Sequence, residues 1–338
     1  MDYASPVSLL GSSMKLRLFA SLAVLLAAVA SIAEVAAQPY PSRPVKLIVP
    51  YAPGGAGDVI ARIVSVQLAK DLGVSVVVEN KPGAGGMIGA QAVASAPPDG
   101  YTVLVGNTTE MVVSPYIVKS ASYETQRDFR PVALAGYLPQ LLIANPSVKA
   151  TTIDEFIALA KAQPGVYSYA TAGTGSTAHI AGAMLERLSG IKMLSVPYKG
   201  GAQAVTDVLA GNVSIYFSGI PPAIQHVKAG KLTALGVAQP RPVSSLPNVP
   251  PLATGALARL DLTAWFAFFV PKGTPDDIVT LLNTRLRQIL DTPEMQTRLV
   301  DTGVEPGSMS VAQFEQFVAS ERAKYGRFIS ELAIQAEQ

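Results

Sequence analysis

Between residues 44 and 70 the spacing of apolar positions changes once, at a run of glycines. Residues 45–49 are a short apolar run typical of a buried strand. From Asp58 onward the spacing becomes helical, with apolar residues at Ile60, Ile63, Val64 and Leu68. The pattern therefore predicts a strand, a turn over residues 50–57 and a helix.

This first turn places Gly54, Gly55, Ala56 and Gly57 directly before Asp58. Glycine adopts positive φ readily and leaves no Cβ over the backbone N–H groups. The first N–H groups of a helix have no intrahelical partner, and the helix dipole places partial positive charge there. The turn is therefore a candidate anion site, and a turn that only starts a helix is the alternative.

A second turn of the same kind follows a predicted strand at residues 167–170 and precedes another helical pattern. Its candidate residues are Ala172, Gly173, Thr174, Gly175, Ser176 and Thr177. Neither turn contains Arg or Lys, so an anion would be held by backbone N–H groups, hydroxyls and bound water. A charge-assisted hydrogen bond contributes roughly 1.5–3 kcal/mol and micromolar binding needs about 8 kcal/mol, so we expect both turns to face one ligand.

The rest of the chain alternates between strand and helix patterns. Further strands are predicted at residues 74–79, 101–105, 132–135, 141–144, 193–196, 213–217 and 232–237, and residues 265–270 are interpreted as a buried strand or a hinge segment. This alternation predicts an α/β fold with mainly parallel sheets. A chain of 338 residues, 49% of them hydrophobic, favours two domains. Domain 1 would comprise residues 38–138 and 255–338, and domain 2 residues 139–254.

The C-terminal part is predicted to be helical. Pro275 is expected at the first position of a helix, and Ser310 with Gln313 forms a capping box, as does Thr152 with Glu155 earlier in the chain. An apolar stripe in the last helix is interpreted as core, and it comprises Phe314, Phe317, Val318, Tyr325, Phe328, Ile329 and Leu332.

Polar residues at the carboxyl ends of strands are further candidates, because open α/β sheets usually bind ligands at that edge. Thr108 and Thr109 follow the strand at 101–105, and Ser218 directly follows the strand at 213–217. A helix N-cap is the alternative for the two threonines. The glycines at residues 83–86 are interpreted as a structural turn and not as a dinucleotide fingerprint, because Ile88 stands where that fingerprint needs glycine.

Composition excludes several kinds of chemistry. The formal charge of +2 and the absence of a basic run argue against nucleic acid as a partner. The chain has no Cys and only two His residues, which excludes thiolate catalysis and a multi-histidine metal site. We expect His179, in the first turn of its helix, to have a structural packing role, with ligand contact as the alternative, and His226 to lie at a helix C-terminus. No hydrolase, phosphate-loop or zinc motif is present, so binding without chemistry is the simpler interpretation, and no cofactor is expected.

The N-terminus predicts export. Lys15 and Arg17 precede an apolar run over residues 18–33, and Ala37 ends a small-residue segment suited to cleavage before Gln38. A retained membrane anchor is the alternative, although the run is shorter than the ~20 residues that a spanning helix needs. Either Met1 or Met14 could be the start.

Several segments together resemble the Bug, or TctC, family of extracytoplasmic receptors of tripartite tricarboxylate transporters. The matching segments, in order, are residues 40–44, 49–58, 80–86, 98–101, 171–177 with His179, 196–200 and 229–232. The resemblance covers essentially the whole chain after the predicted signal.

The resemblance implies a two-domain periplasmic-binding-protein fold of the second type, each domain a mainly parallel sheet flanked by helices. It also implies a small carboxylate held in the interdomain cleft through both glycine turns, with Tyr51, Thr108, Thr109 and Tyr198 as neighbours. The partner would be a membrane permease, and we expect the receptor to be a monomer. An exported sensor for a signalling receptor, or an exported enzyme acting on a small acid, is the alternative function.

One departure bears on the ligand. Many relatives carry an acidic residue where this chain has Ser218 and Gly219 before two prolines. An acidic residue there could pair with a ligand ammonium, so we expect a mono- or dicarboxylate or an aromatic acid and not an amino acid.

Overall fold

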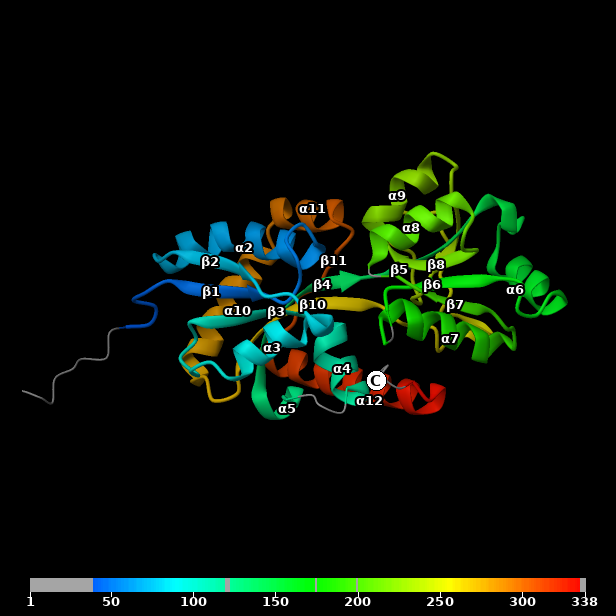
Figure 1. Ribbon diagram of the computed structural model, residues 1–338. Coiled ribbons are helices and arrows are strands. Elements are labelled where there is room, and N and C mark those ends of the chain that lie inside the picture. Colours follow the sequence, from blue (N-terminus) through cyan, green and yellow to red (C-terminus); the bar gives the residue numbers. More distant parts are fainter. Residues whose placement is uncertain (1–38, 119–121, 174, 199, 335–338) are drawn as a thin grey trace, which may run out of the picture. The chain divides into compact units, whose positions relative to one another are not determined.

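The computed structural model describes residues 39–118, 122–173, 175–198 and 200–334, and the predicted signal peptide lies outside them (Figure 1). Their strands form two sheets. Within these described ranges, no helix has the length and apolarity needed to cross a membrane.

The first sheet has six strands in the order β11-β4-β10-β3-β1-β2. Their bounds are β1 Val45–Val49, β2 Val76–Asn80, β3 Thr102–Asn107, β4 Phe129–Leu138, β10 Ala264–Pro271 and β11 Glu305–Pro306. Strand β1 pairs in parallel with β2 and β3, whereas β10 is antiparallel to both β3 and β4.

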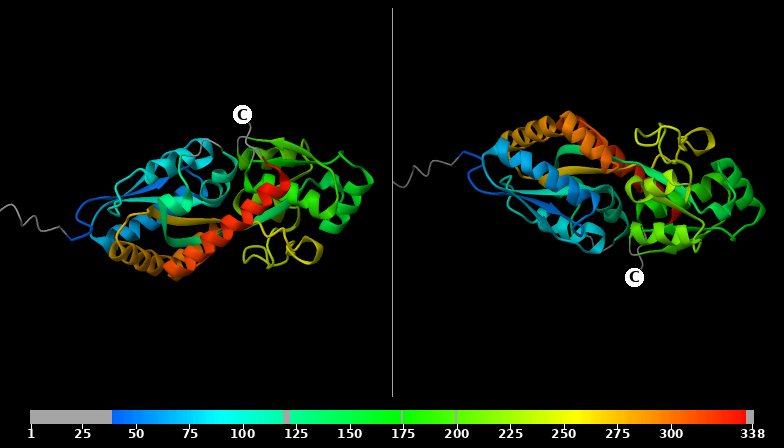
Figure 2. Two further views of the ribbon diagram at one scale, coloured as in Figure 1. Left: turned by 90° about the horizontal axis from the view of Figure 1, so that it is seen from below. Right: turned by 90° about the horizontal axis from the view of Figure 1, so that it is seen from above.

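Helices α2 and α10 pack on each other, α3 packs on β3, and α12 packs on β4 and on the π-helix η2 (Figure 2). The elements of this part are α2 Ala56–Leu72, η1 Ala84–Gly86, α3 Met87–Ala94, η2 Thr109–Val113, α4 Ser114–Ile117, α5 Thr125–Asp128, α10 Asp276–Leu290, α11 Pro293–Asp301 and α12 Val311–Leu332.

The second sheet has five strands in the order β7-β6-β8-β5-β9. Its elements are β5 Gln140–Ala144, η3 Pro146–Val148, α6 Ile153–Ala162, β6 Ser168–Thr171, α7 Thr177–Ser189, β7 Leu194–Pro197, α8 Gly201–Ala210, β8 Ile215–Gly219, α9 Ile220–Lys228 and β9 Thr233–Val237, and η4 Gly255–Leu257 lies in the segment that follows. Strand β6 is parallel to β7 and β8, whereas β5 is antiparallel to β8 and β9.

The α/β fold class is confirmed, but both sheets are mixed and not mainly parallel. The chain passes from β4 to β5 with only Pro139 between them and returns to the first sheet through β10. Because β10 runs back alongside β4, the two are antiparallel. A crossover helix between two strands would leave them parallel. Here the chain passes between the sheets along strands, so the pairs that these strands form are antiparallel.

Strand β10 is the centre of the first core. All eight of its residues are buried, and Trp265 contacts the ring of Phe314 on α12 at 6.4 Å between centroids. The α12 stripe is confirmed as core: Phe314, Val318, Tyr325, Phe328 and Ile329 are buried, and Phe317 and Leu332 pack against them.

Both predicted capping boxes are present. Thr152 caps Glu155 at α6 and Ser310 caps Gln313 at α12, each reciprocally. Pro275 is the N-cap of α10 and not its first residue, a difference of one position within the usual uncertainty of helix ends. His226 lies in the last turn of α9, as predicted.

Candidate functional site

The first glycine turn leaves the start of α2 without a side-chain cap. Gly54 has φ +88°, and its N–H donates to Asp58 Oδ2 at 3.0 Å. The N-cap is Gly55, in an extended conformation with φ −76° and ψ 166°, and no side chain accepts from the N–H groups that follow it. Among the described residues, Ala56 and Gly57 therefore keep backbone donors available at the positive end of the helix.

Asp58 is buried, and both of its oxygens have protein partners. Oδ2 accepts from the Gly54 N–H and from Arg62 Nε at 2.9 Å, and Oδ1 accepts from Asn80 Nδ2 at 2.9 Å. The hydrogen bond from Arg62 is the main reason that the pKa of Asp58 is lowered to about 2. Asp58 is thus ionised at neutral pH, and in this structure it shapes the turn.

Two further contacts fix the turn in place. Asn80 Nδ2 also donates to the backbone oxygen of Tyr51 at 3.0 Å, which ties β2 to the chain leading into the turn. Gly57 faces the first sheet, where a Cβ would lie 3.0 Å from the ring of Phe266 on β10. Glycine at 57 therefore allows a close approach of α2 to β10.

The second turn satisfies more of its own donors. The Gly175 N–H donates to His179 Nδ1 at 3.1 Å, and the His179 N–H donates to Ser176 Oγ at 3.2 Å. Gly173 has φ +101°, and its N–H donates to Thr171 Oγ1 at 3.3 Å. His179 is therefore hydrogen-bonded to other residues of the turn. Because its Nδ1 accepts a hydrogen bond, the proton of the neutral ring lies on Nε2.

The other predicted residues of this turn differ in exposure. Ala172 is exposed, whereas Ser176 and Thr177 are half-buried at the start of α7. Thr174 lies outside the described residues. The contrast with α2 is clear, since α7 begins with a capping serine and α2 with an uncapped glycine.

The segment formed by η2 and α4 lies against two glycine-rich loops. A Cβ on Gly175 would lie 2.1 Å from Ile117 Cδ1 at the end of α4. A Cβ on Gly86 would lie 3.1 Å from both Tyr51 Oη and Glu110 Oε2. The structure therefore groups the second turn, the loop at residues 83–86 and Tyr51 around residues 109–117.

Glu110 also belongs to this group, and the sequence analysis did not identify it. It is fully buried, its Oε2 accepts from the Tyr51 hydroxyl at 2.5 Å, and its Oε1 accepts from the Asn107 N–H. Burial is the main reason that the pKa of Glu110 is raised to about 8. The sequence offered one signal, an acidic residue directly after the two threonines at a strand end.

The two threonines have different surroundings. Thr108 is fully buried, and its Oγ1 accepts from the Trp265 N–H at 2.8 Å, so its side chain anchors β10. It is the N-cap residue of η2, but its side chain does not cap that helix. Thr109 is half-buried, and its backbone N–H donates to Asn107 Oδ1 at 2.9 Å.

Tyr198 and Ser218 lie at strand ends of the second sheet. The Tyr198 N–H donates to Thr171 O at 2.9 Å, directly before the second turn, and burial with Asp207 nearby raises the pKa of its hydroxyl to about 12. Ser218 is fully buried, and its hydroxyl donates to Gly219 O at 2.7 Å. In this structure Ser218 is not open to a ligand.

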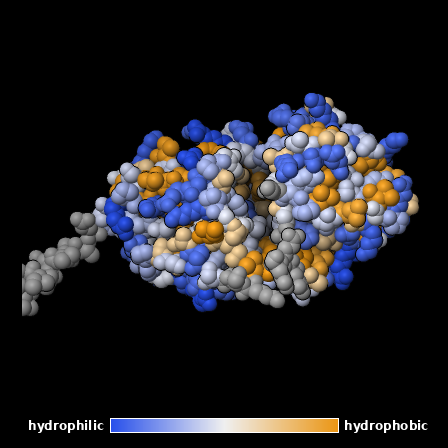
Figure 3. Space-filling view, viewed as in Figure 1, coloured by the Kyte–Doolittle hydropathy of each residue, from blue (hydrophilic) through white to orange (hydrophobic). Residues whose placement is uncertain are grey.

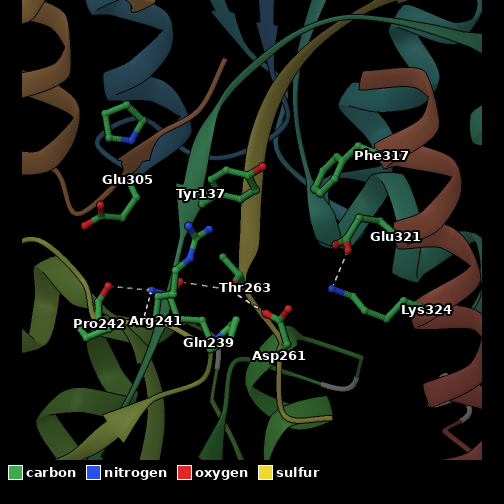
Figure 4. Close-up of a pocket in the computed structure, with 12 residues that line it drawn as sticks. Tyr137, Gln239, Arg241, Pro242, Asp261, Thr263, Glu305, Phe317, Glu321 and Lys324 are labelled. Carbon is green, nitrogen blue, oxygen red and sulfur yellow. Dashed lines mark hydrogen bonds and ion pairs between the residues drawn. The ribbon is translucent and has the colours of Figure 1, made fainter. Parts of the chain in front are cut away.

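A separate cavity, about 490 Å³ in volume, is lined by residues of β4, β11, α12 and the segment between β9 and β10 (Figure 4). Its charged residues are Arg241, Lys324, Asp261, Glu305 and Glu321, and none of the predicted site residues lines it. With three carboxylates and two cations, it suits an anionic ligand poorly. The face in Figure 3 mixes hydrophilic and hydrophobic residues and has a recess near its middle.

Comparison with known proteins establishes the family. Residues 60–334 match the model of the tripartite tricarboxylate transporter family receptor, TctC. Protein BugT of Bordetella pertussis is 33% identical over 316 residues, covering 93% of this chain and 97% of BugT. The chain therefore belongs to the TctC family, whose members are solute-binding proteins and not enzymes.

Solved structures agree on the fold. The R. palustris protein Rpa4515, solved with adipate, superposes with a TM-score of 0.79 at 29% identity, covering 88% of this chain and 100% of that one. MatC from Rhodopseudomonas palustris, solved with bound malate, gives a TM-score of 0.75 at 30% identity, covering 86% and 100%. The fold is that of the periplasmic binding proteins of this family.

Proposed function

We propose that this protein captures a small carboxylate at the N-terminus of α2, with the second turn as the opposing wall, and delivers it to a tripartite-type membrane permease. The observation that carries the proposal is the uncapped start of α2, where Gly55 provides no side-chain acceptor and Asp58 is turned back onto Gly54. Uncapped N–H groups at a helix N-terminus are suited to binding a carboxylate.

The ligand class follows from what surrounds these donors. The two turns contain no Arg or Lys, so recognition rests on neutral donors and suits a carboxylate on an otherwise neutral body. Solved relatives carry adipate and malate, both dicarboxylates, which supports this class. The absence of an acidic residue at Ser218 argues against a ligand ammonium group.

We also propose the domain division and the export. The strands of the first sheet come from residues 45–138 and 264–306, and those of the second from residues 140–237. This supports domain 1 at residues 38–138 and 255–338 and domain 2 at 139–254. Export through a signal peptide ending near Ala37 is supported by a solved relative described as a periplasmic transporter, which has a TM-score of 0.79 at 33% identity.

The proposal is tested by denaturing the purified protein from Gln38 onward and identifying released small molecules by mass spectrometry. Calorimetric titration with malate, adipate and any acid that appears then measures binding. We expect a carboxylate at one per chain that rebinds unchanged. Chemical turnover of that acid would favour the exported enzyme. If no acid of a broad panel binds, the proposal that the ligand is a carboxylate is rejected.

A further inference from the structure

A carboxyl group with no cationic partner among the described residues is buried beside the proposed ligand site. Glu110 has no exposed surface, and its two oxygens accept from the Tyr51 hydroxyl and the Asn107 N–H. Tyr51 belongs to the first turn, and the same carboxyl lies against Gly86 at the start of α3. Two glycine loops with exposed residues therefore flank this buried acid.

The titratable groups facing this carboxyl are two tyrosines. Tyr51 reaches it from the loop after β1, and Tyr123, before α5, donates its hydroxyl to the backbone oxygen of Glu110 at 2.6 Å. No Lys, Arg or His of the described residues from β3, α3, β10 or α12 contributes to the charge balance of this carboxyl. Its ionised form is therefore stabilised by hydrogen bonds alone and opposed by burial.

Above about pH 7, where Glu110 begins to ionise, an anion bound in the loop that carries Tyr51 would be repelled by the carboxylate to which Tyr51 donates. Like charges in a poorly solvated region disfavour each other, and the group that can take up a proton becomes neutral. We propose that, above about pH 7, the carboxylate ligand binds together with a proton taken from solvent by Glu110, while Tyr51 changes from donor to acceptor in their shared hydrogen bond. The inference rests on the proposed carboxylate function.

The sign of the effect follows from linkage. Burial already raises the pKa of Glu110 to about 8 in the free protein, and a bound anion raises it further. Below about pH 7 Glu110 is protonated in both states, so affinity is constant there. As the pH rises through 8, the free protein loses the proton that the complex retains, and affinity falls by up to tenfold per pH unit.

The experiment is calorimetric titration of the full mature protein with malate and adipate between pH 6.5 and 9, in two buffers of different ionisation enthalpy. We expect binding about five- to tenfold weaker at pH 9 than at pH 6.5, with up to half a proton taken up per ligand at pH 8. Glu110→Gln mimics the protonated acid, so its affinity should stay constant over the range and its proton uptake should vanish. Glu315→Gln, an exposed change on α12, should behave as the wild type does.

Three outcomes are distinguishable. If neither acid binds at any pH, the proposed function fails and not merely the proton coupling. If the acids bind with constant affinity and no proton uptake, Glu110 is a structural carboxylate packed against Gly86 and the inference is overturned. If Glu110→Gln does not fold, Tyr51→Phe decides, because removing the donor to Glu110 must move the fall in affinity to higher pH, and an unmoved midpoint rejects the coupling.

Discussion

Replacing Ala56 with proline removes one backbone donor at the proposed anion site and leaves the fold intact. Ala56 is the first residue of α2, a position where proline is favoured because its missing N–H has no intrahelical role. The preceding Gly55 has ψ 166°, the extended conformation that a residue before proline requires. The substitution therefore isolates the N–H from the geometry of the turn.

The expected loss is that of one charge-assisted hydrogen bond to a carboxylate, about 1.5–3 kcal/mol. At 1.4 kcal/mol per factor of ten, ligand binding should weaken roughly 10- to 150-fold. The assay is calorimetric titration with the acid that the wild type binds, alongside a thermal melt. The melting temperature should stay within a degree or two of the wild type, because no intrahelical hydrogen bond is lost.

Val311→Pro is the matched control. Val311 is the first residue of α12, and Ser310 before it is extended with ψ 163°. This variant makes the same backbone change far from the turns in sequence and should bind the acid as the wild type does. An Ala56→Pro protein that folds normally and binds within a factor of two of the wild type would refute the assignment of the ligand to the start of α2.

Two further predictions concern stability. The pKa of Asp58, lowered to about 2 from 3.8, means that its ionised form stabilises the fold above pH 4 and that this contribution is lost as the pH falls from 4 to 2. Asp58→Asn should therefore lower the free energy of unfolding by up to about 2 kcal/mol at pH 7 and by little at pH 2, and equal loss in denaturant melts at both pH values would contradict the linkage. In α7, a Cβ on Gly182 would lie 2.2 Å from the Tyr169 ring, so Gly182→Ala should destabilise by about 1–3 kcal/mol although alanine favours helix. Gly55→Ala, whose Cβ meets only Ala52 O at 3.8 Å, is its control and should melt close to the wild type.

Local order was predictable because it depends on near neighbours in the chain. The strand at 45–49 and the helix that follows the glycines appear where the apolar spacing places them. The capping boxes at Thr152 and Ser310 depend on residues three positions apart and were also predicted. The antiparallel pairing of β4 with β10 joins residues more than 120 positions apart, and the local pattern does not encode it.

Some features of the candidate site likewise depend on local sequence, and others depend on tertiary packing. The sequence by itself determined two glycine turns at helix starts, since glycine content and apolar spacing are local properties. Tertiary structure alone decided that Asn80 on β2 donates to Asp58, that Ser218 is buried, and that Glu110 lies fully buried against Tyr51. Burial and charge environment arise from elements packed together from distant parts of the chain, and these set the pKa of a carboxyl group and decide which donors remain for a ligand.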